Sequence, residues 1–451
     1  MGYNRHLMHG RVTQAAPEAI ETQDVVVSGI GVPNMALVLS SGATAIDTEA
    51  AGMAPMIGFM NPSKQCFAGS SHRDDNAPVR AYSQASIAGV VNQLEPQTDG
   101  TLLTRGVYSD RVTDGFELNF TVGNAGAHLY SSILMRDGVQ DMDIAEFTLP
   151  ASGSVSVSMA FEPDVILFLS AGNATTNKDN SGTLGLAAGI PQGAVGAAML
   201  SAGYREQFAN NTSNAKSTMR DNDTAIASME PNSSTVNTFS AGLFSASGFT
   251  AAREEGSTEM LVTAVGIKLQ PGYEAAIGQI NTPTETGRHT LGREELAPEF
   301  VLLFGAGVAA DNTDEDGIGV SIGVSGGMAN QTCVSGGTMP VATPKPAKSR
   351  HSDSEIIRVH RDPDQKPQAV AALEGLTADG GMMLNFTEAN ESVRMIYLMI
   401  GRQSARAISK KPVKRKSTSV DILKRAYDGP RERVADYEFG GRNFYQKDNP
   451  T

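Results

Sequence analysis

The chain repeats one pattern three times: PNMALVLSSG at residues 33–42, PDVILFLSAG at 163–172 and PEFVLLFGAG at 298–307. In each copy a proline stands nine residues before a glycine, and an apolar run fills the space between them. A second glycine follows ten residues after the first, and another apolar run begins there. These second glycines are Gly52, Gly182 and Gly317. Because the copies lie 130 and 135 residues apart in a chain of 451 residues, the sequence predicts one domain present in three copies.

A second motif marks the end of each copy at a matching distance. It reads DGFELNFT at residues 114–121 and DGGMMLNFT at 379–387, and it is shortened to SGFT at 247–250. A closing apolar segment follows each motif, at residues 129–135, 395–400 and 260–267 respectively. Two motifs in the same order and at the same spacing support the triplication.

The apolar runs indicate β-strands. They are five to eight residues long and are bounded by Gly, Pro, Asn and Asp, which makes them too short for buried helices. Val155, Val157 and Met159 alternate with serines, as in a strand with one buried face. Proline at the head of each repeated run suits a strand's first residue, where a missing N–H is tolerated. We therefore predict an all-β protein with three tandem β-sandwich or jelly-roll-like repeat domains.

The repeats also set the expected domain boundaries. We place an N-terminal arm at residues 1–23, the three repeat domains at 24–136, 137–268 and 269–402, and a basic C-terminal tail at 403–451. The polar stretch in the middle of each repeat differs most between copies, so we expect it to make contacts specific to each copy.

Charge is divided unevenly between body and tail. The net charge is −13, yet residues 402–451 hold 13 Lys and Arg against 6 Asp and Glu, which leaves 23 against 43 in the remaining 401 residues. The tail contains a basic run at 410–416 and one expected short helix, capped by Thr418 or Ser419 and stopped by Gly429 and Pro430. The basic run has no interleaved aromatic residues, and an acidic body repels phosphate, so we disfavour nucleic acid as a partner. We expect the tail to dock on an acidic neighbour surface; a solvated tail and a nucleic-acid contact are the alternatives.

Motifs that carry chemistry are weak. The chain has no GxxxxGK[ST] phosphate loop and no HExxH zinc motif. Residues 312–317, preceded by Asp311, match the first half of a calcium-binding loop, but the twelfth position is Gly323 instead of glutamate. The corresponding loops of the other two copies are not comparably acidic, so we favour a solvated acidic hairpin tip over a metal site.

Several histidines stand near carboxylates, a combination that can serve acid–base chemistry or bind a metal. They are His72 with Asp74 and Asp75, His351 with Asp353 and Glu355, and His360 with Asp362. Polar loops accumulate such residues, and no nucleophile is evident beside them, so we interpret them as surface loops. Cys66 and Cys333 lie at nearly equivalent places in the first and third copies, which favours buried core thiols. We assign no catalytic, cofactor-binding or metal-binding residue and expect no cofactor.

Two of the motifs resemble a known kind of protein. The end motif at 114–121 and 379–387, with its closing strand as in Ile396–Gly401, and the strand Phe161–Phe168 (FEPDVILF) resemble repeats in tandem-repeat β-sandwich structural proteins of tailed bacteriophages. The resemblance covers most of residues 25–401, and the second copy departs from it at Ala251-Ala-Arg253, where Leu-Asn-Phe would stand. It implies a virion component and brings no catalytic residue with it.

The expected function is therefore that of a non-enzymatic structural protein of a tailed-phage virion, assembled in the host cytoplasm. The leading interpretation is a tail-associated building block (sheath, tube or fibre base) whose copies join each other and other virion proteins through terminal arms. The alternatives are a capsid decoration protein and a host-surface or carbohydrate-binding virion protein that uses the variable loops near 61–95 and 191–235. No apolar run reaches the roughly 18 residues of a membrane span, and the first ten residues lack the apolar core of a signal peptide, so no membrane is expected as a partner.

Overall fold

The computed structural model describes residues 7–403 with gaps. The gaps are residues 74–79, 95–99, 124–127, 173–174, 176–180, 193–195, 208–214, 222, 230–235, 293, 327–329, 340–346, 362–365 and 378–379, and the description ends before residue 404. Within these limits the regular secondary structure consists of strands, which confirms the predicted all-β class. The short helix expected in the tail lies outside the described residues.

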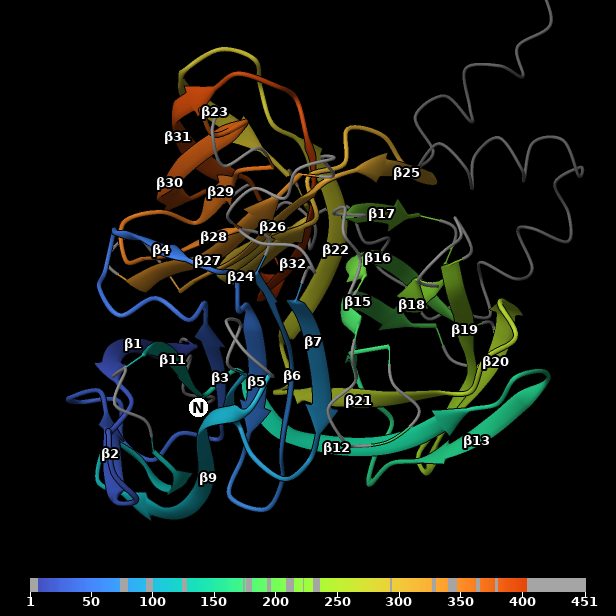
Figure 1. The fold of residues 1–451 in the computed structure, drawn as a ribbon. Coiled ribbons are helices and arrows are strands. Elements are labelled where there is room, and N and C mark those ends of the chain that lie inside the picture. The colour runs from blue at the N-terminus through green and yellow to red at the C-terminus, as the bar shows by residue number, and fades with distance from the viewer. Residues whose placement is uncertain are drawn as a thin grey trace, which may run out of the picture. The chain divides into compact units, whose positions relative to one another are not determined.

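Each third of the chain forms one large and one small antiparallel sheet (Figure 1). The strands of the first repeat are β1 (Met8–Ala15), β2 (Thr22–Val26), β3 (Met35–Ser40), β4 (Glu49–Ala51), β5 (Met56–Met60), β6 (Gln65–Arg73), β7 (Arg80–Ser86), β8 (Val91–Leu94), β9 (Leu102–Val112), β10 (Gly115–Val122) and β11 (Leu129–Arg136). Those of the second are β12 (Val139–Leu149), β13 (Ser154–Ser158), β14 (Val165–Ser170), β15 (Ser181–Pro191), β16 (Ala197–Gln207), β17 (Lys216–Arg220), β18 (Ala225–Met229), β19 (Val236–Ser245), β20 (Gly248–Glu255) and β21 (Met260–Leu269). Those of the third are β22 (Tyr273–Asn281), β23 (Gly287–Leu291), β24 (Leu296–Gly305), β25 (Thr313–Asp316), β26 (Ile318–Ser325), β27 (Gln331–Thr338), β28 (Lys348–Ser352), β29 (Ile357–Val359), β30 (Ala369–Leu376), β31 (Met382–Ala389) and β32 (Arg394–Gln403).

The strand order is the same in all three repeats. The first large sheet runs β1-β11-β3-β5-β6-β7 and its small sheet β2-β10-β9-β8. The second repeat has β12-β21-β14-β15-β16-β17 with β13-β20-β19-β18, and the third has β22-β32-β24-β26-β27-β28 with β23-β31-β30-β29. The threefold pattern of the sequence is thus a set of three β-sandwiches with one topology.

The start of the first sandwich differs from the expectation. Residues 8–15 were expected in an N-terminal arm, but they form β1, which pairs with β11 along its whole length, from Met8 opposite Arg136 to Ala15 opposite Leu129. β1 occupies the place that β12 and β22 hold in the other repeats. Its sequence, MHGRVTQA, has little apolar alternation, so periodicity alone could not identify it as a strand.

The inner strands of the large sheets are buried on both faces. In the equivalent strands β3, β14 and β24, Leu37, Leu167 and Leu302 belong to one apolar cluster to which all three repeats contribute, called the central core below. The next residue of each strand points the other way, into the interior of its own sandwich, where three separate clusters lie. This double burial explains why these strands read as continuous apolar runs instead of alternating ones.

Glycines of the end motif allow the small sheets to pack closely. A side chain on Gly115 would place its Cβ 1.9 Å from the carbonyl oxygen of Val25, and one on Gly248 would lie 1.9 Å from that of Val157. No Cβ tolerates such an approach to a backbone oxygen, so the motif keeps glycine where the neighbouring strand passes.

Candidate functional site

Two of the loops between the paired glycines leave their own repeat and add a strand to another. β4, in the 42–52 loop of the first repeat, pairs with β28 of the third, where Glu49 lies opposite Arg350. β25, in the 307–317 loop of the third repeat, pairs with β17 of the second, where Asp316 lies opposite Lys216. We refer to the contact surfaces between repeats as seams. Each loop connects two neighbouring antiparallel strands of its own large sheet and also joins two repeats.

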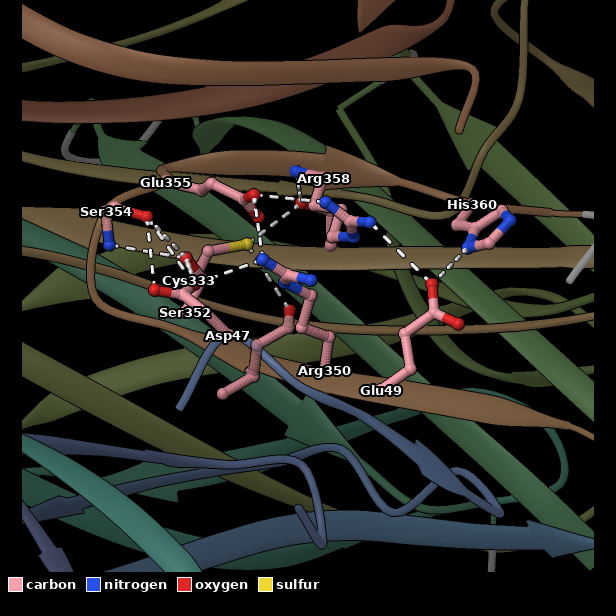
Figure 2. Close-up of polar contacts among 11 residues, drawn as sticks. Asp47, Glu49, Cys333, Arg350, Ser352, Ser354, Glu355, Arg358 and His360 are labelled. Carbon is pink, nitrogen blue, oxygen red and sulfur yellow. Dashed lines mark hydrogen bonds and ion pairs between the residues drawn. The ribbon is translucent and has the colours of Figure 1, made fainter. Parts of the chain in front are cut away.

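Ion pairs reinforce the seam between the first and third repeats (Figure 2). Arg350 Nη2 lies 3.3 Å from Asp47 Oδ1 and 3.6 Å from Glu355 Oε1. The hydroxyl of Ser352 donates to Asp47 Oδ1 at 2.5 Å. Burial raises the pKa of Glu355, and the guanidinium groups of Arg358 and Arg350 oppose that rise. Asp47 comes from the first repeat and its partners from the third, so the network ties the loop to its neighbour.

The same network continues along β4. Arg358 lies 3.0 Å from Glu355 and 3.8 Å from Glu49, and His360 Nδ1 lies 3.8 Å from the same Glu49 oxygen. His360 was expected on a surface loop but is largely buried, with Glu49 of β4 beside it. The carboxylates and guanidinium groups are arranged for mutual neutralisation between repeats.

Residues 311–317, which match the first half of a calcium-binding loop, also form ion pairs across a seam, here between the second and third repeats. Asp314 lies 3.0 Å from Arg220, and Asp316 lies 3.8 Å from Lys216. Glu315 of the same strand pairs with Arg361. The expectation of a solvated acidic hairpin tip is therefore wrong for Asp314 and Glu315, which lie in strand β25 and pair with arginines, whereas Asp316 is largely exposed.

Side chains of the first repeat cover the open edge of β12 at the seam with the second repeat. Asn34 Nδ2 donates to the carbonyl of Val139 at 2.5 Å, and Asn61 Nδ2 donates to that of Met142 at 2.7 Å. Lys64 Nζ donates to the carbonyl of Ile144 at 3.0 Å and also pairs with Asp143. An edge covered in this way does not offer its carbonyls to another strand.

His72 is buried at the seam between the first and second repeats. Its Nε2 lies 3.0 Å from Ser70 Oγ, which lies 2.7 Å from the hydroxyl of Tyr204 in the second repeat. Burial lowers the pKa of His72 to about 3. The neighbouring Asp74 and Asp75 lie outside the described residues. The surface-loop interpretation is wrong for this histidine, because a second repeat covers its strand.

His351 is buried at the seam between the first and third repeats. Its Nε2 lies 2.6 Å from Ser131 Oγ of the first repeat, and burial lowers the pKa of His351 to about 4. A serine beside a histidine is the start of a nucleophilic pair. Here both side chains are fully buried, and Asp353 is hydrogen-bonded to Thr13, so the arrangement holds repeats together and gives no access to a substrate.

The two cysteines are free and buried, as expected. Burial raises the pKa of both thiols, that of Cys333 to about 12. Cys66 belongs to the central core, whereas Cys333 contacts Ser321 at 3.5 Å. Thiols of this kind are unreactive at neutral pH.

One open cavity of about 410 Å³ lies at the seam of the first and second repeats. Its lining residues are Ser63, Lys64, Gln65, Ile87, Tyr108 and Ile144. Burial raises the pKa of Tyr108, so its hydroxyl stays protonated at neutral pH and can donate a hydrogen bond. The cavity combines an aromatic ring, polar side chains and an ammonium group that already pairs with Asp143.

The lysines and arginines on β17 and β28, the strands with which β25 and β4 pair, were not identified from the sequence. Lys216 and Arg220 stand on one face of β17, and Lys348 and Arg350 are near neighbours on β28. The available signal was the presence of positive charges in short strands of otherwise mostly neutral residues. Only the strand pairing between repeats shows which carboxylates these charges bind. No group of three or more His, Cys, Asp or Glu side chains among the described residues is arranged to hold a metal ion.

Comparison with known proteins adds no relative: no family model matches the chain, and no curated protein or solved structure matches it either. In the part of the chain that the structure describes, no helix has the length and hydropathy needed to span a membrane.

Proposed function

We propose that this chain is a non-enzymatic structural protein of a tailed-phage virion, a building block present in many copies. A place in the tail, as a sheath, tube or fibre-base subunit, is the leading assignment, and a capsid decoration protein is the alternative. The proposal rests on the resemblance of the repeated motifs to phage structural proteins and on the way the repeats are joined.

The joining of the repeats is the observation that carries the proposal. The large sheets share the central core. Strand pairing connects the third repeat to both others, through β4 with β28 and β25 with β17. Polar groups that a hydrolase would place around a substrate are here paired with one another across the seams. A body built in this way transmits load and holds its surfaces in fixed positions, as a subunit of a large assembly must.

The basic tail is the proposed connection between copies. The tail, residues 403–451, holds 12 Lys and Arg against 6 Asp and Glu, which complements a body that holds 24 against 43. β32 extends to Gln403, so a deletion that spares the fold removes residues 404–451.

Sedimentation velocity of the full chain and of the 404–451 deletion tests this connection. We expect the deletion to abolish higher-order assembly while the thermal unfolding transition of the body is unchanged. A matched variant with Lys410, Lys411, Lys414, Arg415 and Lys416 changed to glutamine separates charge from chain length. Assemblies of full size in the deletion variant would show that the tail does not join the copies.

The cavity at the first seam supports a second candidate function, host-surface carbohydrate binding. Tyr108 and Lys64 line it together with residues of the variable 61–95 region, and sugars bind by stacking on an aromatic ring with hydrogen bonds from polar neighbours. A glycan array with the full chain tests this role. Binding that Tyr108→Ala abolishes would favour it, and an array without signal would exclude the sugars displayed.

A further inference from the structure

β13 forms one margin of the small sheet in the second repeat, with β20 as its hydrogen-bonded neighbour (Figure 1). The N–H of Arg253 donates to the carbonyl of Gly153 at 2.9 Å, and that of Met159 donates to the carbonyl of Ser247 at 3.1 Å. Since antiparallel hydrogen bonding alternates along a strand, odd-numbered residues from 153 to 159 face β20. The N–H and C=O groups of Ser154, Ser156 and Ser158 therefore point toward the open side of the sheet.

This open edge lacks the charges and prolines by which proteins block edge pairing. Its three serines are exposed, and residues 154–158 contain no charge and no proline. The equivalent strands of the other small sheets each carry a charge, Asp24 in β2 and Arg288 in β23. Asp24 and Ser156 hold the same place, since they lie opposite Glu117 and Thr250 at matching positions after the motif glycines. Charges on an edge strand oppose pairing with another chain, so β13 is the unprotected edge among these three.

The sequence of β13 is also its own antiparallel complement. Ser-Val-Ser-Val-Ser reads the same in both directions around Ser156. In an antiparallel pair of two such strands, each serine opposes a serine and each valine a valine. The groups that point outward are those of the serines, so these pairs are the ones that exchange both N–H···O bonds.

We propose that β13 pairs with β13 of a second copy of this chain, across a two-fold axis that passes beside Ser156. The two small sheets then form one continuous sheet through an isologous contact. The inference rests on the proposed function in that it supplies one of the contacts through which copies assemble. It is separate from the tail contact, which joins a basic segment to an acidic surface.

Disulfide cross-linking of the full chain tests the pairing. In Ser156→Cys the two thiols face each other at the axis, where a hydrogen-bonded pair holds Cα atoms about 5.5 Å apart, within the range that a disulfide spans. The native thiols of Cys66 and Cys333 are buried and do not compete. Asp24→Cys and Thr290→Cys place a thiol at the equivalent position of the other small sheets and serve as matched controls. Under mild oxidation we expect covalent dimers as the main product of Ser156→Cys, with at least tenfold lower yields from the controls.

A second variant tests the same contact without a covalent cross-link. Ser156→Lys brings two like charges together at the axis, and we expect at least tenfold weaker dimerisation by sedimentation equilibrium with an unchanged unfolding midpoint. Cross-linking of Ser156→Cys no greater than that of Asp24→Cys, with multi-copy assemblies intact, would overturn the edge pairing and leave the structural role standing. Cross-linked dimers that never build larger assemblies with the tail present would support the pairing and contradict the structural role.

Discussion

The large and small sheets of each sandwich follow the same chain but meet different surroundings. Inner strands of the large sheets, such as β3 and β14, are buried at every position, because one face packs in the sandwich and the other in the central core. Strands of the small sheets, such as β10 and β13, alternate between buried and exposed residues. The large sheets therefore form the joint scaffold, and the small sheets present their outer faces to solvent.

The outer faces of the small sheets are also where the repeats differ. In the first repeat Asp24, Glu117 and Asp110 lie opposite one another across three neighbouring strands. The matching place in the second repeat holds Ser156 opposite Thr250. One topology thus presents an acidic face in one copy and a small, neutral face in another, which suits contacts with different partners.

The largest expected effect comes from truncating the central core. Phe304 in β24 is 2% exposed and belongs to that core. Phe304→Ala should lower the free energy of unfolding by about 3–5 kcal/mol, because it removes buried apolar area and leaves a cavity. Guanidinium chloride denaturation measures it. Thr121→Ala on the exposed face of β10 is the control, with a change within about 0.5 kcal/mol. Equal effects of the two substitutions on the free energy of unfolding would contradict the difference in burial between the large and small sheets.

The next effect concerns the crossing between the large and small sheets. A Cβ on Gly323 in β26 would lie 1.8 Å from the carbonyl oxygen of Ile356, and Gly58 and Gly185 make similar approaches in the other repeats. Gly323→Ala should cost about 3 kcal/mol, because backbone must move to relieve the overlap. Gly242→Ala meets nothing closer than 3.7 Å and should change stability little. Thermal unfolding of the two variants compares them, and a mild Gly323→Ala would mean that the sheets are not closely packed there.

Acid should weaken the seams before the small sheets. The buried imidazoles of His72 and His351 have pKa values of about 3 and about 4, below the ordinary 6.5, because burial disfavours their charged forms. The unfolded chain takes up these protons first as the pH falls, so this stability is complete above pH 6.5 and is lost progressively below it. Between pH 7 and 5 each histidine should cost about 2 kcal/mol. Denaturation at both pH values checks this.

Substitution of these histidines separates their effect from that of other groups. His72→Gln and His351→Gln should each reduce the pH dependence by their share, whatever they do to stability at pH 7. Thr121→Ala, on the exposed face of β10, removes no titratable group; it is the control and should leave the slope unchanged. Identical slopes in all the variants would show that the buried histidines do not govern acid sensitivity.

The smallest effect on the free energy of unfolding is expected at β25, the strand of the third repeat that pairs with β17 of the second. Asp314 and Arg220 are 19% and 12% exposed, so Asp314→Asn leaves a poorly solvated guanidinium group and should cost about 1 kcal/mol. Asp316 is 73% exposed, and Asp316→Asn should have no measurable effect. Addition of calcium should leave the unfolding temperature unchanged, because Asp314 is occupied by arginine. A rise in that temperature with calcium would restore the metal-site interpretation.

The sequence predicted the repeated strands well because their signals are local. Each apolar run after Pro33, Pro163 and Pro298 indicates a buried strand. The glycine of the end motif indicates a close approach of a neighbouring backbone. β1 was not predicted because Met8 and Val12 are its only large apolar residues and do not alternate along a continuous stretch. The glycine at 323 was visible, but its partner at Ile356 is distant in sequence, so the reason for a glycine could not be read.

The seams could not be predicted for a physical reason. A β-strand pairs with whatever edge lies beside it, and the partners of Glu49 and Asp316 are in other repeats. The same holds for the histidines: His72 and His351 look like loop residues beside carboxylates until another repeat covers them. Charge and polarity in a sequence indicate exposure only where no second domain lies above the residue.

Electron cryo-microscopy of the intact particle tests the central claim most directly. We expect this chain in a regular array of many copies on the virion, with each triple sandwich as one rigid body. Purified particles that lack the chain, with the protein present only in the infected cell, would contradict it.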